Sequence, residues 1–212
     1  ILLNEDIHAV VNVIDAKNIE RMLPLTLQLI EGGLDVILVL NIMDEAAGLG
    51  IKINIDKLKS VLGIPVIAAI STIGTGLPEL KKTIMDFMPH RVVPAYHNGE
   101  LKDALRILTE ILRTKNLKRP ELAALICTLG DKAFKEDLLK LYPELSEIFM
   151  RHLSHADKSD SINYQFATRR QEFVSEVIHG AVVMTQAGFS KLQNILNKIT
   201  INPWTGFPLL AI

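Results

Sequence analysis

The fold is decided by the stretch Leu38-Val39-Leu40-Asn41-Ile42-Met43-Asp44-Glu45-Ala46. The apolar run from Val36 to Leu40 predicts a strand that is covered on both faces, as the strands of parallel sheets are. The polar residues that follow have the pattern Asn-x-x-Asp. A carboxylate can accept the imino N–H and the exocyclic N–H of guanine together, and adenine lacks this pair of donors. Asp44 is therefore a candidate reader of a guanine base, while the Asn41 amide either holds the loop or meets the acceptors of the purine.

Around this stretch, the first 89 residues alternate between strand and helix patterns. The predicted strands are 9–14, 36–40 and 66–70, and the predicted helices are 19–30, 55–62 and 77–88. Asn54 and Gly63 are the expected N-cap and C-terminal stop of the second helix. Three consecutive βα units predict an α/β fold with a partial parallel sheet. Ligands of such sheets bind at the carboxyl ends of the strands.

The predicted sheet brings three segments to one rim, namely 12–15, 41–44 and 71–76. A second Asn-x-x-Asp runs from Asn12 to Asp15, but Asn12 lies inside a predicted strand, so position favours Asn41 and Asp44 as the base reader. The segment 71–76 contains Gly74 and Gly76. It could aim backbone N–H groups at a base carbonyl, or it could be an ordinary glycine-containing turn between a strand and a helix.

The second half of the chain predicts an all-α domain. We expect an α/β domain at 1–89, a proline-containing linker at 90–99, a helical domain at 100–200 and a distinct tail at 201–212. The predicted helices are roughly 100–115, 120–128, 131–141, 143–155, 162–180 and 188–199, with a polar break at 157–161. The uncharged tail is either a buried C-terminus or the start of a truncated membrane segment, since Trp204 suits a membrane boundary.

Composition and motifs exclude several classes of function. With 23 basic and 24 acidic residues, the chain has no long-range field that favours nucleic acid. The single Cys127 rules out an internal disulfide and fits a reducing compartment. His152 and His155 with Asp157 could bind a metal, but histidines at such a helix end are more often solvated, and we expect no metal. The sequence contains no G-x-x-x-x-G-K-[ST], so P-loop phosphoryl transfer is not expected of these residues.

The run from Val10 to Glu31 resembles the bacterial ferrous iron transport protein B family, through Asp-Ala, Glu-Arg and Leu-Thr-Leu-Gln-Leu at matching places. The stretch from Val39 to Ala46 fits the same family in register. Members of this family have an N-terminal GTPase domain, a helical domain likened to a dissociation inhibitor, and a transmembrane iron pathway. The resemblance implies that residues 1–89 are the C-terminal half of the GTPase domain, and that GTP or GDP contacts Asn41, Met43, Asp44, Ser71 and Thr72.

By the same resemblance, the phosphate loop and its Mg²⁺ would lie before Ile1, and the iron-conducting helices after Ile212. We therefore expect a central fragment of a GTP-regulated Fe(II) transporter at the cytoplasmic face of the bacterial inner membrane. We expect the parent to contact the membrane through the region after Ile212. The fragment itself we expect to be soluble or close to the membrane, to bind the nucleotide weakly or not at all, and to be inactive as a GTPase. One alternative is a non-catalytic interaction module in which the helical half does the work. Another is a fragment of a different Asn-x-x-Asp GTPase, against which the long match from Glu20 to Leu29 argues.

Overall fold

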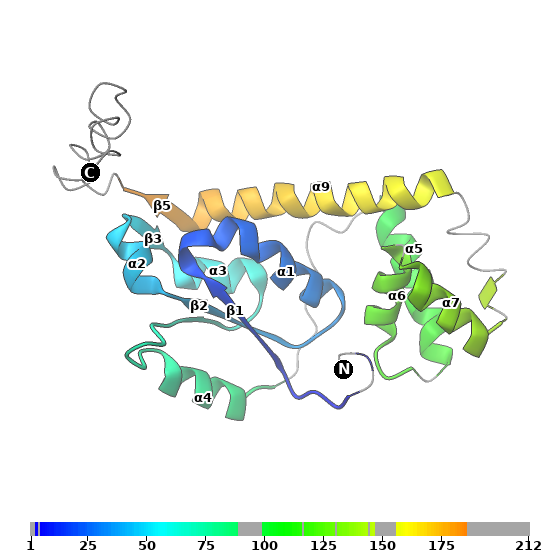
Figure 1. The fold of residues 1–212 in the computed structure, drawn as a ribbon, viewed down its shortest axis with the longest axis horizontal. Helices are drawn as coiled ribbons and strands as arrows, with labels where there is room; N and C mark the ends of the chain where they lie inside the picture. Colours follow the sequence, from blue (N-terminus) through cyan, green and yellow to red (C-terminus); the bar gives the residue numbers. More distant parts are fainter. Residues whose placement is uncertain are drawn as a thin grey trace, which may run out of the picture.

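The computed structural model describes residues 3, 5–88, 99–115, 117–129, 131–143, 145–146 and 156–185. Three parallel strands form the central sheet in the order β1-β2-β4 (Figure 1). They are β1 (Val10–Asp15), β2 (Val36–Asn41) and β4 (Val66–Ala68). β2 lies in the middle, and its residues from Val36 to Leu40 are all buried. The α/β fold with a parallel sheet followed by helices is thereby confirmed.

Helices cover both faces of this sheet. They are α1 (Ile19–Glu31), α3 (Ile55–Leu62) and α4 (Leu77–Met85). Leu38 and Leu40 of β2 pack in the core that α1 and α3 share, whereas Ile37 packs with the residues of α4. This division follows from the alternation of side chains along a strand. The helices do not cover the rim at the carboxyl end of the sheet, where the loops after the strands lie.

The ends of these elements follow local chemistry. The Asn54 side chain caps α3 by accepting from the Lys57 N–H, and Gly63 ends it with a φ of 67°, as predicted. β4 ends at Ala68, two residues before the predicted end, because Ile70 pairs with Thr75 across the following turn. α4 likewise ends at Met85 and not at residue 88.

Four helices follow in the part of the chain that the structure describes, and none of them is long and apolar enough to span a bilayer. They are α5 (Gly99–Thr114), α6 (Pro120–Thr128), α7 (Lys132–Leu141) and α9 (Ala156–Ala181). Cys127 is buried in the core of α5, α6 and α7. Burial raises the pKa of its thiol to about 12, so this cysteine is an unreactive packing residue.

The predicted polar break at 157–161 is wrong. α9 runs without interruption from Ala156 to Ala181. The polar segment holds neither glycine nor proline, so nothing in it disfavours helical backbone strongly enough to end a helix. Gly99, the last residue of the predicted linker, is the first residue of α5. The rest of the linker, most of the predicted helix 143–155, the helix 188–199 and the tail 201–212 lie outside the described residues, as do His152 and His155.

Four short elements next to the rim were not predicted. They are η1 (Ala16–Asn18), α2 (Met43–Gly48), β3 (Ile51–Ile53) and β5 (Val182–Met184). β3 and β5 pair antiparallel, and the Thr185 N–H and hydroxyl both donate to the Gly50 carbonyl. These hydrogen bonds hold the segment after α9 next to α2. Neither β3 nor β5 has the continuous apolar run of five residues that predicted β4, and each is fixed by pairing with a segment far away in the sequence.

A buried ion pair joins α1 to α9, which lies along the outer side of α1 and α3 (Figure 1). Arg170 Nη2 lies 2.6 Å from Glu31 Oε2, and Nε lies 3.1 Å from Oε1. The Glu31 side chain is 0% exposed and that of Arg170 7%, so both charges have lost most of their water. Each charge is therefore stabilised by the other inside the fold.

We predict that Arg170→Met lowers the free energy of unfolding by about 3–5 kcal/mol, because it leaves the Glu31 carboxylate buried without its cation. The double variant Glu31→Leu/Arg170→Met should recover most of that loss. Arg106→Met is the matched control, since its pair with Asp103 is 65% and 66% exposed and should contribute little. Urea unfolding of the variants measures this. A single variant as stable as the wild type would contradict it.

Candidate functional site

Asn41, the last residue of β2, is joined by two hydrogen bonds to Ser71 in the turn after β4. The Asn41 Oδ1 accepts from the Ser71 N–H at 3.0 Å, and its Nδ2 donates to the Ser71 Oγ at 3.0 Å. The Asn41 amide thus holds two neighbouring loops of the rim in a fixed relation. Of the two roles open to this amide, holding the loop is the one that the geometry supports.

The residue after Asn41 has a strained backbone. Ile42 has a φ of 62° and is the one non-glycine residue with positive φ among the residues that the structure describes. A β-branched side chain disfavours this left-handed conformation, and such residues gather at functional sites. The turn lets the Met43 N–H reach the Ala69 carbonyl at 3.3 Å and starts α2 directly after the strand. It places Asp44 in the first turn of α2.

The Asp44 side chain is exposed at this rim. Among the described residues no donor is hydrogen-bonded to its carboxylate, so both oxygens are open to a ligand. Met43 is half-buried and packs against the main core, which fixes the start of α2. An anchored helix that presents an open carboxylate is the arrangement needed for accepting two parallel N–H donors.

The turn at 71–76 supplies a second polar group. The Ser71 N–H is already bonded to Asn41, and the Ile70 N–H donates to the Thr75 carbonyl at 3.1 Å. The Thr72 N–H makes no hydrogen bond to any described residue, and its side chain is exposed. Within the predicted pair Ser71 and Thr72, the free backbone donor therefore belongs to Thr72.

Lys17 lies beside this site, although the sequence analysis did not select it. It belongs to the short 3-10 turn η1 (Ala16–Asn18), and its Nζ donates to the Glu45 carboxylate of α2. That hydrogen bond raises the pKa of Lys17, and the negative charges of Asp15, Glu45 and Asp44 act in the same direction. The sequence did hold a signal for Lys17. Asp15, the last residue of β1, pairs in register with Asn41, so a lysine two residues after Asp15 lies near the loop that follows Asn41.

The second Asn-x-x-Asp is structural. Asn12 is 9% exposed, and its Nδ2 donates to the Thr26 Oγ1 at 2.8 Å, which ties β1 to α1. Asp15 caps η1 by accepting from the Lys17 N–H at 2.8 Å and from the Asn18 amide at 2.9 Å. Both side chains are used within the fold, in agreement with the placement of Asn12 in a strand.

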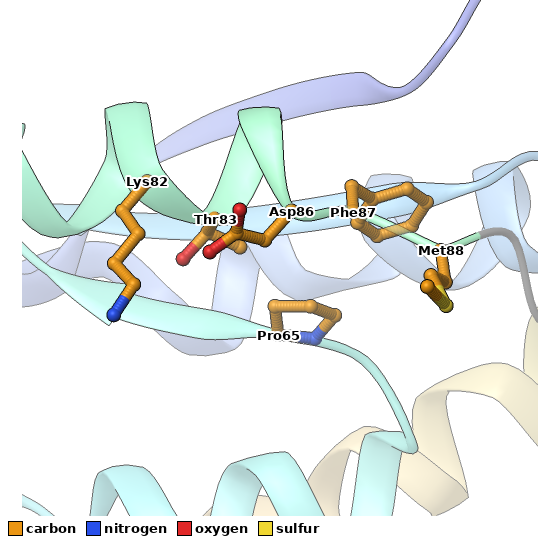
Figure 2. A pocket seen from close by; sticks show the side chains of 6 residues that line it. All are labelled: Pro65, Lys82, Thr83, Asp86, Phe87 and Met88. Atoms are coloured by element: carbon orange, nitrogen blue, oxygen red, sulfur yellow. The ribbon is translucent and has the colours of Figure 1, made fainter.

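A pocket of about 310 Å³ lies at the other end of the sheet. Figure 2 shows Pro65, which precedes β4, facing Thr83 and Asp86, with Lys82 and Met88 at the two sides. Because ligands of parallel sheets bind at the carboxyl ends of the strands, this position at the amino end does not suit the ligand of the rim. Among the described residues no group of acidic, histidine or cysteine side chains could hold a metal ion.

A parallel sheet with exposed polar groups in the loops at its carboxyl end is typical of α/β proteins that bind nucleotides. Comparison with known proteins is more specific. Residues 1–84 match the family model described as ferrous iron transport protein B. The Fe(2+) transporter FeoB of Escherichia coli strain K12 is 43% identical over 99 residues, which make up 47% of this chain and 13% of that protein. The FeoB of Salmonella typhimurium strain LT2 is 27% identical over 210 residues, 98% of this chain and 27% of that protein.

A solved structure matches over most of the chain. The crystal structure of the cytosolic domain of the T. maritima FeoB iron transporter in its GMPPNP form is 32% identical, with a TM-score of 0.70. The match covers 86% of this chain and 71% of that one. The chain belongs to the ferrous iron transport protein B family. It spans no more than about a quarter of the length of the two FeoB proteins that it matches, at 13% and 27%.

We predict that Asn41→Ala lowers the free energy of unfolding by about 1–2 kcal/mol, because two hydrogen bonds are lost. It should also speed amide hydrogen exchange at Ser71. Ser71→Ala is the matched control, since it removes one bond and keeps the Ser71 N–H on the Asn41 Oδ1. Equal exchange at residue 71 in the two variants would show that the bridge does not hold the turn.

The glycines of the turn give a second test. A Cβ on Gly76, which has a φ of 81°, would lie 2.2 Å from the Ala68 carbonyl oxygen, whereas one on Gly74, with a φ of 79°, meets nothing within 4 Å. Both alanine variants suffer backbone strain, but only Gly76→Ala also displaces β4. We predict that Gly76→Ala costs about 1–3 kcal/mol more than Gly74→Ala in thermal or urea unfolding. Equal costs would contradict the close approach.

Proposed function

We propose that this chain provides the guanine-reading side of the GTPase unit of a ferrous iron transporter. The single observation that carries the proposal is the open Asp44 carboxylate next to the Asn41–Ser71 bridge. The two Asp44 oxygens accept the imino and exocyclic N–H groups of guanine. The Thr72 N–H donates to the base carbonyl on the neighbouring edge. Met43 anchors α2 under the base, so Asn41, Met43, Asp44, Ser71 and Thr72 form the proposed site.

The relatives support this ligand class. The T. maritima domain was solved in a GMPPNP form, and GMPPNP carries a guanine base. The E. coli and Salmonella relatives are Fe(2+) transporters by name. We infer that GTP binding and hydrolysis in the protein of which this unit forms part regulate Fe(II) uptake, with the unit on the cytosolic side of the membrane. Iron is the cargo of that process, and Mg²⁺ would accompany the nucleotide phosphates, so neither is assigned a residue here.

Of the steps in GTP binding and hydrolysis, recognition of the guanine base is the one that these residues can perform. The 212 residues include no phosphate-loop sequence, and the proposal assigns them no catalytic residue. Nucleosides are therefore the suitable probes, because they test the base contacts without relying on a phosphate site. They also separate the contacts of the base edge, since inosine differs from guanosine by the exocyclic amine.

We predict that guanosine at millimolar concentration shifts the backbone NMR signals of 41–46 and 71–76, and that inosine and adenosine do so less. Asp44→Asn should weaken guanosine binding at least about tenfold, because an amide N–H would face the guanine donors. The same variant should gain affinity for xanthosine, whose carbonyl replaces the exocyclic amine. Asp56→Asn, an exposed carboxylate in the first turn of α3, is the matched control.

Two results would contradict the proposal. One is a wild-type chain in which no nucleoside shifts the signals of 41–46. The other is an Asp44→Asn variant that responds to guanosine as the wild type does.

A further inference from the structure

Lys17 connects the end of β1 to the helix that carries the proposed base reader. Its Nζ donates to the Glu45 carboxylate and lies 3.9 Å from the Asp15 Oδ2. Its side chain is 25% exposed, which is less than expected for a free surface lysine. The contact therefore spans two separate loops of the rim, one after β1 and one after β2.

Three carboxylates surround this lysine, and their roles differ. Asp15 is held by the Lys17 N–H and by Asn18, so it cannot turn toward the base. Glu45, which is 60% exposed, is held by the Lys17 ammonium. Asp44 is within electrostatic reach of Lys17 but makes no hydrogen bond to it. Of the three, Asp44 alone keeps both oxygens open.

We propose that Lys17 is a positioning residue for guanine recognition, which holds Glu45 aside and keeps the Asp44 carboxylate open to the base. This inference rests on the proposed guanine site at Asn41–Asp44. Without the lysine charge, Glu45 is free to turn and two neighbouring carboxylates repel each other at the start of α2. The base would then meet a less ordered acceptor, and recognition of its exocyclic amine would suffer most.

A positioning role of Lys17 and a purely structural role can be told apart. Since partly exposed ion pairs contribute little to stability, removing Lys17 should hardly change the free energy of unfolding. A positioning role instead changes which nucleoside is preferred. The informative quantity is the ratio of guanosine affinity to inosine affinity, because only guanosine carries the second donor.

The test titrates the full chain with guanosine, inosine and adenosine while following the NMR signals of 41–46. Lys17→Met should weaken guanosine binding about threefold and reduce the preference over inosine. Lys17→Arg should retain both. Lys17→Met/Glu45→Gln should bind guanosine better than Lys17→Met, since the uncompensated charge is removed with its partner. Lys52→Met on β3 is the control for a general loss of positive charge.

The outcomes separate the two proposals. If no nucleoside binds the wild type at 41–46, the guanine site itself is wrong and this inference falls with it. If guanosine binds the wild type and Lys17→Met equally well, with the same preference over inosine, the site stands and the role of Lys17 is overturned. An equal loss for all three nucleosides, or an equal loss in Lys52→Met, would also overturn it.

Discussion

The proposed site depends on the two hydrogen bonds between Asn41 and Ser71. β2 is buried along its apolar length, so its last residue is fixed in the middle of the sheet. From that position the Asn41 amide uses its oxygen and one N–H to hold the turn after β4. Asp44 and Thr72 are then brought to one rim from separate loops. Asn41 thus fixes the positions of Asp44 and Thr72, although its own amide is not proposed to contact the base.

The same rim is also tied to the rest of the molecule. α2 leads into β3, β3 pairs with β5, and β5 follows α9 directly. At the other end of α1, the Glu31–Arg170 pair fastens α9 to the sheet layer. The helical half thus packs on the layer that carries the site through α9 and also through Leu122 of α6, which lies in the core of that layer.

Elements with a continuous apolar run or a clear cap could be predicted from the sequence, including the three-residue strand β4, whereas α2, β3 and β5 could not. The apolar run at 36–40 and the cap at Asn54 each depend on local residue types. β3 and β5 depend on pairing between residues more than 100 positions apart, as between Ile51 and Met184. Asn41 and Asp44 were visible as a motif. The contact of Lys17 with Glu45 was not visible, because Glu45 belongs to α2, which follows a different strand.

The most direct test of the account is to locate the bound base. Photo-crosslinking the chain with 8-azidoguanosine, followed by peptide mapping, identifies the residues next to it. The account predicts labelled peptides from 41–46 and 71–76, with labelling that guanosine suppresses and adenosine does not. Labelling at the pocket of Pro65 and Lys82, or equal suppression by guanosine and adenosine, would contradict it.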